Sequence, residues 1–204
     1  MAGRDRVAAG RALLAHARCD VLLCDDGLQH YALRRDLEIV VVDGERKFGN
    51  GACLPAGPLR ERPTRLREAD RVVALEQACP EAETVLPVVD AGAYRLDDPG
   101  RRCELSAFAN QAVHAVAGIA QPQRFFRRLR QAGIIVTPHA FGDHHRFVAE
   151  ELNFGATQAV LMTEKDAVKC RSFSRSNWWV VPLEVRVEAT FGDWLVDAVR
   201  LQEH

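Results

Sequence analysis

The chain has 204 residues, which is enough for about one to one and a half domains. Its formal net charge of -1 excludes nucleic-acid binding that relies on overall positive charge. No apolar run approaches the roughly 18 residues of a membrane span. The six cysteines form no C-x-x-C pair, so we expect reduced thiols in a cytosolic chain and no zinc site.

Strands and helices are expected to alternate along the chain. Residues 5–17 have helical spacing, and the runs 20–24 and 37–43 are short apolar strands of the kind buried on both faces of a parallel sheet. The Gly/Pro-rich segment 44–63 is long for a connection, which favours a functional loop. Further strands are expected at 71–75, 84–89, 112–119, 133–141, 159–163 and 178–185, and helices at 120–133, 164–173 and 192–202. This order predicts an α/β fold with a mostly parallel sheet and flanking helices.

Two adjacent carboxylates, Asp25 and Asp26, follow the apolar run 20–24. Ligands of open α/β sheets bind beyond the carboxyl ends of the strands, and P-loop phosphotransferases hold Mg²⁺ with an Asp at such a strand end. Gln29 and His30 add two polar groups that can form hydrogen bonds to a substrate. The alternative is structural: Asp25 caps an Asx-turn or a helix, and Asp26 begins a tight turn.

A P-loop enzyme also needs the G-x-x-x-x-G-K-[ST] segment, whose lysine reaches the phosphates. The sequence contains no Gly-Lys dipeptide, and its glycine-rich segment "FGNGACLPAG" lacks the lysine. Either the protein is not a P-loop enzyme, or the part that bears this loop is absent.

The segment "DDGLQHYALRRDLEIVVVDGERKFGNGACLPAGPLRERPTRLREAD", with "GIAQPQRFF", "DHH" and "MTEKDAVKC", resembles the tetraacyldisaccharide 4'-kinases, which are the lipid A kinases of Gram-negative bacteria. The resemblance runs from about residue 4 to the C-terminus. It implies phosphoryl transfer from ATP, with Mg²⁺, to the 4'-hydroxyl of tetraacyldisaccharide 1-phosphate, a lipid A precursor. It also implies a place at the cytoplasmic face of the inner membrane.

Members of that family carry an upstream membrane-associating segment, the P-loop and an Asp-containing stretch similar to "GDEP", and this sequence has none of the three. We therefore expect an N-terminally truncated kinase that is inactive alone. Residues 1–45 would be a remnant of the P-loop kinase core, and residues 46–204 a C-terminal α/β domain whose last helix is a candidate to pack back on the core.

The resemblance also assigns roles to residues. Asp25 and Asp26 become the metal side of a phosphate site, and His144 pairs with the upstream Asp to activate the sugar hydroxyl. The alternative for residues 143–145 is a helix cap with solvated imidazoles. Arg60 and Glu61 would approach the phosphates and a second Mg²⁺, through guanidinium donors and carboxylate oxygens. An exposed ion pair at a helix start is the alternative for this pair.

Lys165 and Asp166 are similar to the T-K-x-D loop with which other P-loop proteins bind the nucleotide base, although here the two residues are adjacent. A capping box with Thr163 as N-cap and Asp166 at the third helical position is the alternative.

Two rival functions stay open. A metal-dependent phosphoesterase could use Asp25, Asp26, His30 and residues 143–145 as a two-metal site, although no D-x-D motif accompanies them. A non-catalytic module that binds the lipid sugar is the other.

Overall fold

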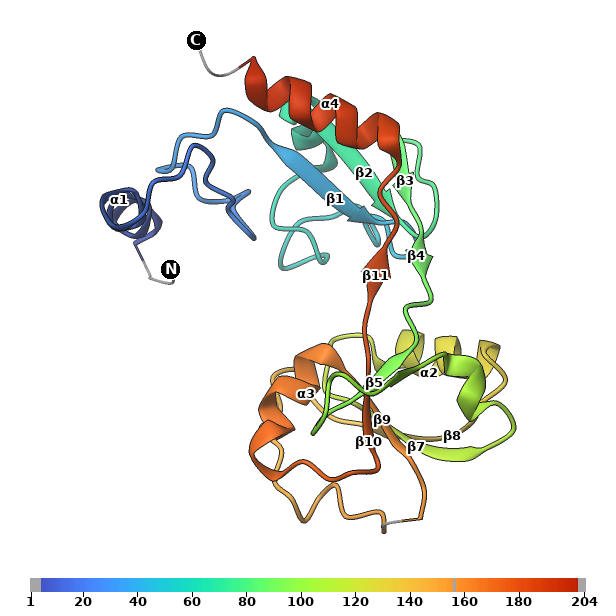
Figure 1. Cartoon of the computed structure of the whole chain (residues 1–204). Helices are drawn as coiled ribbons and strands as arrows, with labels where there is room; N and C mark the ends of the chain where they lie inside the picture. The colour runs from blue at the N-terminus through green and yellow to red at the C-terminus, as the bar shows by residue number, and fades with distance from the viewer. Residues whose placement is uncertain (1–4, 156, 202–204) are drawn as a thin grey trace. The chain divides into compact units, whose positions relative to one another are not determined.

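The computed structural model describes residues 5–155 and 157–201, which form two compact units (Figure 1). One unit runs to Pro87 and resumes at Val187, and the other spans Val88–Arg186. The chain therefore does not divide at the expected position between 45 and 46. The strands on either side of that position are hydrogen-bonded neighbours, so a boundary there would cut through one sheet.

The first unit is built on a small parallel sheet. Its strands β1 (Ile39–Asp43), β2 (Arg71–Leu75) and β3 (Thr84–Leu86) lie in that order. The 3₁₀ helix η1 (Pro63–Glu68) precedes β2, and the last helix, α4 (Ala189–Arg200), belongs to the same unit. The core is small, consisting of Val42, Val72, Ala74 and Cys79 with partly buried neighbours. The guanidinium of Arg71 lies 4.2 Å from the centre of the Trp194 ring, which connects β2 to α4.

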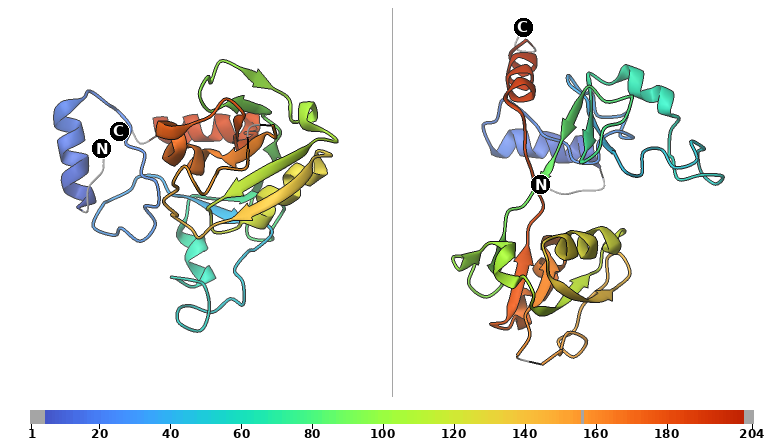
Figure 2. Two further views of the ribbon diagram at one scale, coloured as in Figure 1. Left: turned by 90° about the horizontal axis from the view of Figure 1, so that it is seen from below. Right: turned by 90° about the vertical axis from the view of Figure 1, so that its right-hand side faces the viewer.

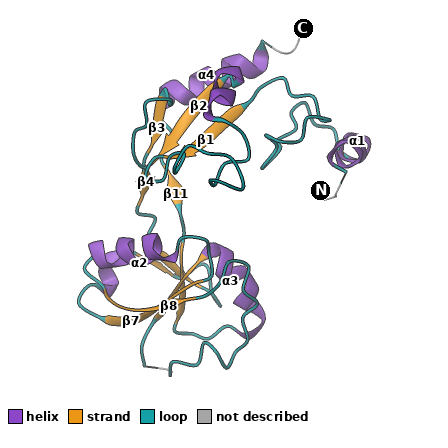
Figure 3. Ribbon diagram, turned by 180° about the vertical axis from the view of Figure 1, so that it is seen from behind, coloured by secondary structure: helices purple, strands orange, loops and turns teal. Residues whose placement is uncertain are grey.

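Helix α1 (Arg6–His16) begins where the sequence predicts, because the side chain of Asp5 accepts a hydrogen bond from the N–H of Ala8 at 2.9 Å. None of its residues is buried. The expected strand at 20–24, however, is wrong. Figure 3 shows loop throughout the chain between α1 and β1, and Leu23 is 93% exposed. A strand forms only against a neighbour, and within the described residues the sheet of this unit ends at β1.

The second unit has a six-stranded sheet with the order β6-β5-β10-β9-β7-β8. Strands β7, β8, β9 and β10 are parallel to one another, and β5 and β6 are added antiparallel. The bounds are β5 (Ala93–Arg95), β6 (Arg102–Cys103), β7 (Ala112–Ala117), β8 (Ile135–Ala140), β9 (Val160–Thr163) and β10 (Trp178–Val181). A separate antiparallel pair joins β4 (Val88–Val89) to β11 (Glu184–Val185). A turn at Pro99 and Gly100 connects β5 to β6.

Helices cover both faces of this sheet (Figure 2). On one face, Phe125, Phe126 and Leu129 of α2 (Pro122–Gln131) pack on alternate residues of β7. On the other face, Ala167 and Cys170 of α3 (Glu164–Cys170) pack on residues of β9 and β10. The short 3₁₀ helices η2 (Leu105–Phe108) and η3 (Arg171–Phe173) complete these layers. The predicted α/β fold with a mostly parallel sheet and flanking helices is therefore confirmed.

The six cysteines are free thiols, as the sequence predicts. Burial raises the pKa of Cys170 to about 12, so this thiol behaves as a core side chain. Within residues 5–155 and 157–201, no helix has both the length and the apolar character needed to cross a bilayer.

Candidate active site

A cavity of about 340 Å³ lies in the first unit, beside β1 and the loop that follows it. Three of the expected site residues line it: Gln29, Arg60 and Glu61. Lys47 and Arg62 line it as well, although no sequence motif distinguishes them. The loop 44–63 therefore contributes directly to a binding-sized space, as its length suggested. Hydrogen bonds within the loop, such as Leu54 N–H to the carbonyl of Leu59 at 2.8 Å, give it a defined shape.

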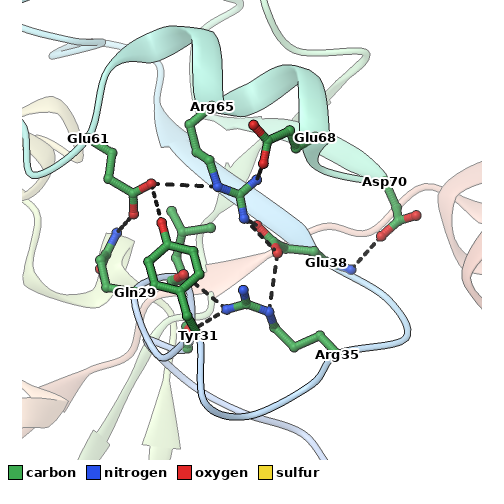
Figure 4. A network of polar contacts seen from close by, with 10 residues as sticks. Gln29, Tyr31, Arg35, Glu38, Glu61, Arg65, Glu68 and Asp70 are labelled. Atoms are coloured by element: carbon green, nitrogen blue, oxygen red, sulfur yellow. Dashed lines mark hydrogen bonds and ion pairs between the residues drawn. The ribbon is translucent and has the colours of Figure 1, made fainter.

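Glu61 belongs to a polar network that Figure 4 shows from close by. The amide of Gln29 donates to Oε1 at 2.9 Å, and the phenol of Tyr31 donates to Oε2 at 2.6 Å. These two hydrogen bonds, Tyr31 first, lower the pKa of Glu61 and keep the carboxylate charged. The hydrogen bond between Tyr31 and Glu61 is also the largest cause of the raised pKa of Tyr31. Gln29 therefore contacts Glu61 in this structure, and its contact with the substrate stays a prediction.

Arg65, on η1, is placed among three carboxylates. It donates to both oxygens of Glu38 at 2.7 and 3.0 Å, and lies 3.6 Å from Glu61 and 3.4 Å from Glu68. Its side chain is only 13% exposed, so the charge is offset by partners and not by water. Arg65 thereby connects the helix η1 to the start of β1.

Asp25 and Asp26 lie in a turn and not at a strand end. Both are exposed, and Asp26 has a left-handed backbone with φ 50°. His30 is exposed too, and its N–H donates to the carbonyl of Gly27 at 2.9 Å. This local geometry is that of the tight turn given above as the alternative. Among the described residues, no three His, Cys, Asp or Glu side chains lie close enough together to hold a metal ion, so Asp25, Asp26 and Glu61 do not form a ready cluster.

In the second unit, loops follow the carboxyl ends of β7 and β8, and α3 follows β9 directly. The loop after β8 contains Asp143, whose Oδ1 accepts from Lys165 Nζ at 2.7 Å and from the N–H of His144 at 3.0 Å. The bond from Lys165 is the largest cause of the lowered pKa of Asp143. His144 has a left-handed backbone with φ 62°, and its side chain is 80% exposed. Its Nε2 lies 3.6 Å from Asp143 Oδ2, and the exposed ring is accessible to a ligand.

Asp166 is fully buried, and its carboxylate is surrounded by donors. Oδ2 accepts from the N–H of Gly118 at 2.8 Å and from the hydroxyl of Thr163 at 2.7 Å, and Oδ1 accepts from Lys169 at 2.9 Å. The Thr163 side chain in turn caps α3 by accepting from the N–H of Asp166. These contacts favour the capping role over contact with a nucleotide base. A Cβ atom at residue 118 would lie 3.0 Å from Asp166 Oδ1 and 3.1 Å from the Phe147 ring, so a larger residue there would require these neighbours to shift.

His145 differs from its neighbour His144. Its Nε2 lies 3.0 Å from Glu151 Oε2, and its ring packs against Phe141 and Phe147, which also contact each other. The contact with His145 is the largest cause of the lowered pKa of Glu151. The His145 ring is therefore held in place by neighbouring side chains, while the His144 ring is exposed.

One further pair of histidines has no counterpart in the sequence analysis. His114 Nδ1 and His139 Nε2 lie 3.0 Å apart on the neighbouring strands β7 and β8, and Phe154 stacks on both rings. Burial, followed by the proximity of His114, lowers the pKa of His139. The pair is 25 residues apart in sequence, so only the register of the two strands brings it together.

The model of the LpxK family, described as tetraacyldisaccharide-1-P 4'-kinase, matches residues 1–200. A protein of Nitrosococcus oceani named tetraacyldisaccharide 4'-kinase is 52% identical over 190 residues, which is 93% of this chain and 56% of the relative. A protein of the same name from Stenotrophomonas maltophilia is 52% identical over 204 residues, covering 95% of this chain and 59% of the relative. The chain thus spans less than two thirds of the length of these curated relatives.

The fold has a solved counterpart. A crystal structure described as the "apo" form of LpxK from Aquifex aeolicus in complex with ATP matches with a TM-score of 0.74, at 24% identity. The match covers 97% of this chain and 63% of the other. With the family model matched along residues 1–200 and relatives at 52% identity, the chain belongs to the tetraacyldisaccharide-1-P 4'-kinase family.

Proposed function

We propose that this chain is part of an ATP-dependent kinase that phosphorylates the 4'-hydroxyl of tetraacyldisaccharide 1-phosphate in lipid A biosynthesis. The observation that carries the proposal is the family match along residues 1–200 together with 52% identity to proteins named for this activity. In the reaction, the 4'-oxygen forms a bond to the γ-phosphorus of ATP, the bond to the β–γ bridging oxygen breaks, and the hydroxyl proton passes to a base.

The two groups of residues described above support complementary roles. Arg60 and Glu61 line the cavity of the first unit, where a guanidinium suits phosphate oxygens and a carboxylate suits Mg²⁺. Mg²⁺ is commonly held by only one or two protein carboxylates plus phosphates and water, so the charged Glu61 fits one ligand position. Asp25 and Asp26, exposed on their turn, are proposed as further contacts to the metal or its waters. When bound, the ion would offset the charge of the phosphates.

His144 is proposed to take part in removing the proton of the sugar hydroxyl, because it is the exposed imidazole of residues 143–145. The acceptor is a lipid, so we also propose that the kinase works at the cytoplasmic face of the inner membrane. Nucleic acid is not an expected partner, since the chain has a net charge of -1.

Radiolabelled ATP and the lipid A precursor test this function directly. The 204-residue sequence contains no G-x-x-x-x-G-K-[ST] segment, so we expect no transfer by this chain alone. A chimera that adds the unmatched part of the Stenotrophomonas maltophilia relative should transfer the label to the precursor. Replacing Asp25 or Asp26 by Ala in that chimera should lower turnover at least ~100-fold if they hold the metal side of the site. A chimera without transfer would count against the kinase, and turnover by the chain alone near that of the chimera would overturn our expectation for it.

The same preparations separate the two rivals. Hydrolysis of phosphate esters with Mn²⁺ would support a phosphoesterase, and binding of the precursor without turnover by the chimera would support a binding module. The separate environments of His144 and His145 favour the kinase, in which a single imidazole acts.

A further inference from the structure

Both oxygens of the Glu61 carboxylate are held by a separate donor, Gln29 on Oε1 at 2.9 Å and Tyr31 on Oε2 at 2.6 Å. An ionised carboxylate has about four lone-pair positions, two on each oxygen. One hydrogen bond on each oxygen therefore fixes the orientation of the group and leaves a lone pair on each oxygen for another ligand. Arg65 lies 3.6 Å from Oε2, which is too long for a strong hydrogen bond.

Tyr31 is not placed here by burial. Tyr31 is 63% exposed, so packing of its aromatic ring contributes little to holding the ring in place. What holds the ring is Arg35, whose guanidinium carbon lies 5.7 Å from the ring centre. Arg35 in turn donates to the carbonyls of Gly27 and Leu28 at 2.7 and 3.0 Å and lies 3.3 Å from Glu38. The phenol is therefore aimed at Glu61 by a guanidinium that is itself held (Figure 4).

The position of Tyr31 relative to the cavity is equally informative. Among the described residues, Gln29, Arg60, Glu61 and Arg65 line the cavity, and Tyr31 does not. The phenol of Tyr31 thus contacts Glu61, which lines the cavity, and does not line the cavity itself. A residue that contacted the substrate directly would be expected to line the space.

We propose that Tyr31 is a positioning residue, whose hydroxyl orients the Glu61 carboxylate so that its remaining lone pairs are available to a divalent cation. This inference rests on the proposed function, in which Glu61 is a ligand of Mg²⁺. Gln29 has the same role on the opposite oxygen. Removing the hydroxyl of Tyr31 frees the carboxylate to rotate toward Arg65, and the cation loses a preset ligand.

Binding of Mn²⁺ by the 204-residue chain tests the inference without turnover. Mn²⁺ takes the oxygen ligands that Mg²⁺ takes, and the free hydrated ion is measured by electron paramagnetic resonance. Tyr31→Phe should weaken binding roughly 10-fold, the lower end of the usual cost of removing a residue that orients a metal ligand. Glu61→Gln should weaken it at least as much. The matched control is Tyr94→Phe, because Tyr94 is the other tyrosine of the chain and lies on β5, and it should leave binding unchanged.

Three results would overturn the proposal. The first is that Tyr31→Phe and Tyr94→Phe bind Mn²⁺ with equal affinity. The second is that Glu61→Gln binds Mn²⁺ as well as the unaltered chain does. The third is a Tyr31→Phe chain whose melting temperature falls while its Mn²⁺ affinity does not, since this describes a purely structural residue.

The kinase assay adds a second readout in the active chimera. Tyr31→Phe should raise the Mg²⁺ concentration that gives half-maximal rate, with a smaller change of kcat at saturating Mg²⁺. A fall in kcat alone would contradict a positioning role. If the chimera shows no transfer, the proposed kinase function fails, and the Mn²⁺ measurements still decide the role of Tyr31.

Discussion

The two units of this chain are stabilised in different ways. Of the largest side chains that the described residues bury completely, only Val73 belongs to the first unit, whereas the second buries Trp178, Phe126 and nine others. The first unit instead concentrates charge around Arg65, with Glu38, Glu61 and Glu68 at 2.7 to 3.6 Å. It also leaves Val41 and Leu23 exposed, at 61% and 93%.

This difference assigns different tasks to the two units. Apolar burial contributes about 25 cal/mol per Å², is not screened by salt and does not titrate with pH, so the second unit should keep its stability over a wide range of conditions. Charged networks near the surface depend on pH and ionic strength and contribute less. Their value in the first unit is orientation, because they fix the direction of polar groups around the cavity.

The largest expected effect is the loss of a core ring from the second unit. Phe126 is 0% exposed, and Phe126→Ala should lower the free energy of unfolding by about 3–5 kcal/mol. Amide hydrogen exchange followed by mass spectrometry should show the increase in exchange in residues 88–186. Equal loss of protection in both units would show that their stabilities are not separate.

A slightly smaller loss of stability is expected at Asp166. Asp166→Ala removes the acceptor of Gly118, Thr163 and Lys169, and should cost about 3 kcal/mol in chemical denaturation. Lys165→Ala is the matched control, since this exposed neighbour pairs with Asp143 at the surface and should cost under about 1 kcal/mol. If Asp166→Ala keeps its stability but raises the KM for ATP in the chimera, then Asp166 contacts the nucleotide and the capping role is wrong.

The two histidines after β8 should differ in turnover. In the active chimera, His144→Ala should reduce kcat about 100-fold, the lower range of general-base catalysis, which corresponds to roughly 2.7 kcal/mol. His145→Ala should change kcat little, because its ring contacts Glu151, Phe141 and Phe147. Steady-state rates at several Mg²⁺ concentrations check this. Equal losses that depend on the metal would favour the phosphoesterase.

The smallest expected effect is on the pH dependence of the first unit. The folded state lowers the pKa of Glu61 below its ordinary value of 4.5, so its contribution is fully present above that pH and is lost as the pH falls through the folded pKa. Glu61→Gln should therefore lower the melting temperature at pH 7 and reduce the loss of stability between pH 5 and pH 2. Thermal melts of both chains over this range measure the difference, and parallel curves would show that Glu61 contributes nothing.

The sequence predicted elements that local patterns determine. The apolar run of β9 and the residues Phe125, Phe126 and Leu129 of α2 identified a buried strand and an amphipathic helix. Thr163 was recognised as a possible cap because capping joins residues only three positions apart. The strand expected at 20–24 failed for the converse reason. An apolar run shows a tendency to pair, but the partner is a property of the whole sheet.

The site was less accessible to sequence reasoning. Gln29 and Glu61 were both selected, yet their contact spans 32 residues of sequence, and no local pattern encodes it. Tyr31 and Arg65 were missed because each resembles an ordinary surface residue until the loop 44–63 and η1 bring them together. The sequence feature that pointed to this network is the high density of acidic residues and arginines in segments 34–38 and 60–68.

Strand β8 forms one edge of the six-stranded sheet, and its sequence limits unwanted association. Ile135 donates its N–H to the carbonyl of Gln111, directly before β7, and Phe141 donates to the carbonyl of Ala117 in β7. Backbone groups of the residues in between, including Pro138, therefore alternate to face outward. Proline has no N–H, and the free edge therefore lacks a donor near its middle. Ile135 is 59% exposed and offers an apolar contact to a strand of another chain. Such a strand could not form a continuous series of backbone hydrogen bonds along β8, because Pro138 interrupts it. We expect Pro138 to favour solubility of this protein at high concentration.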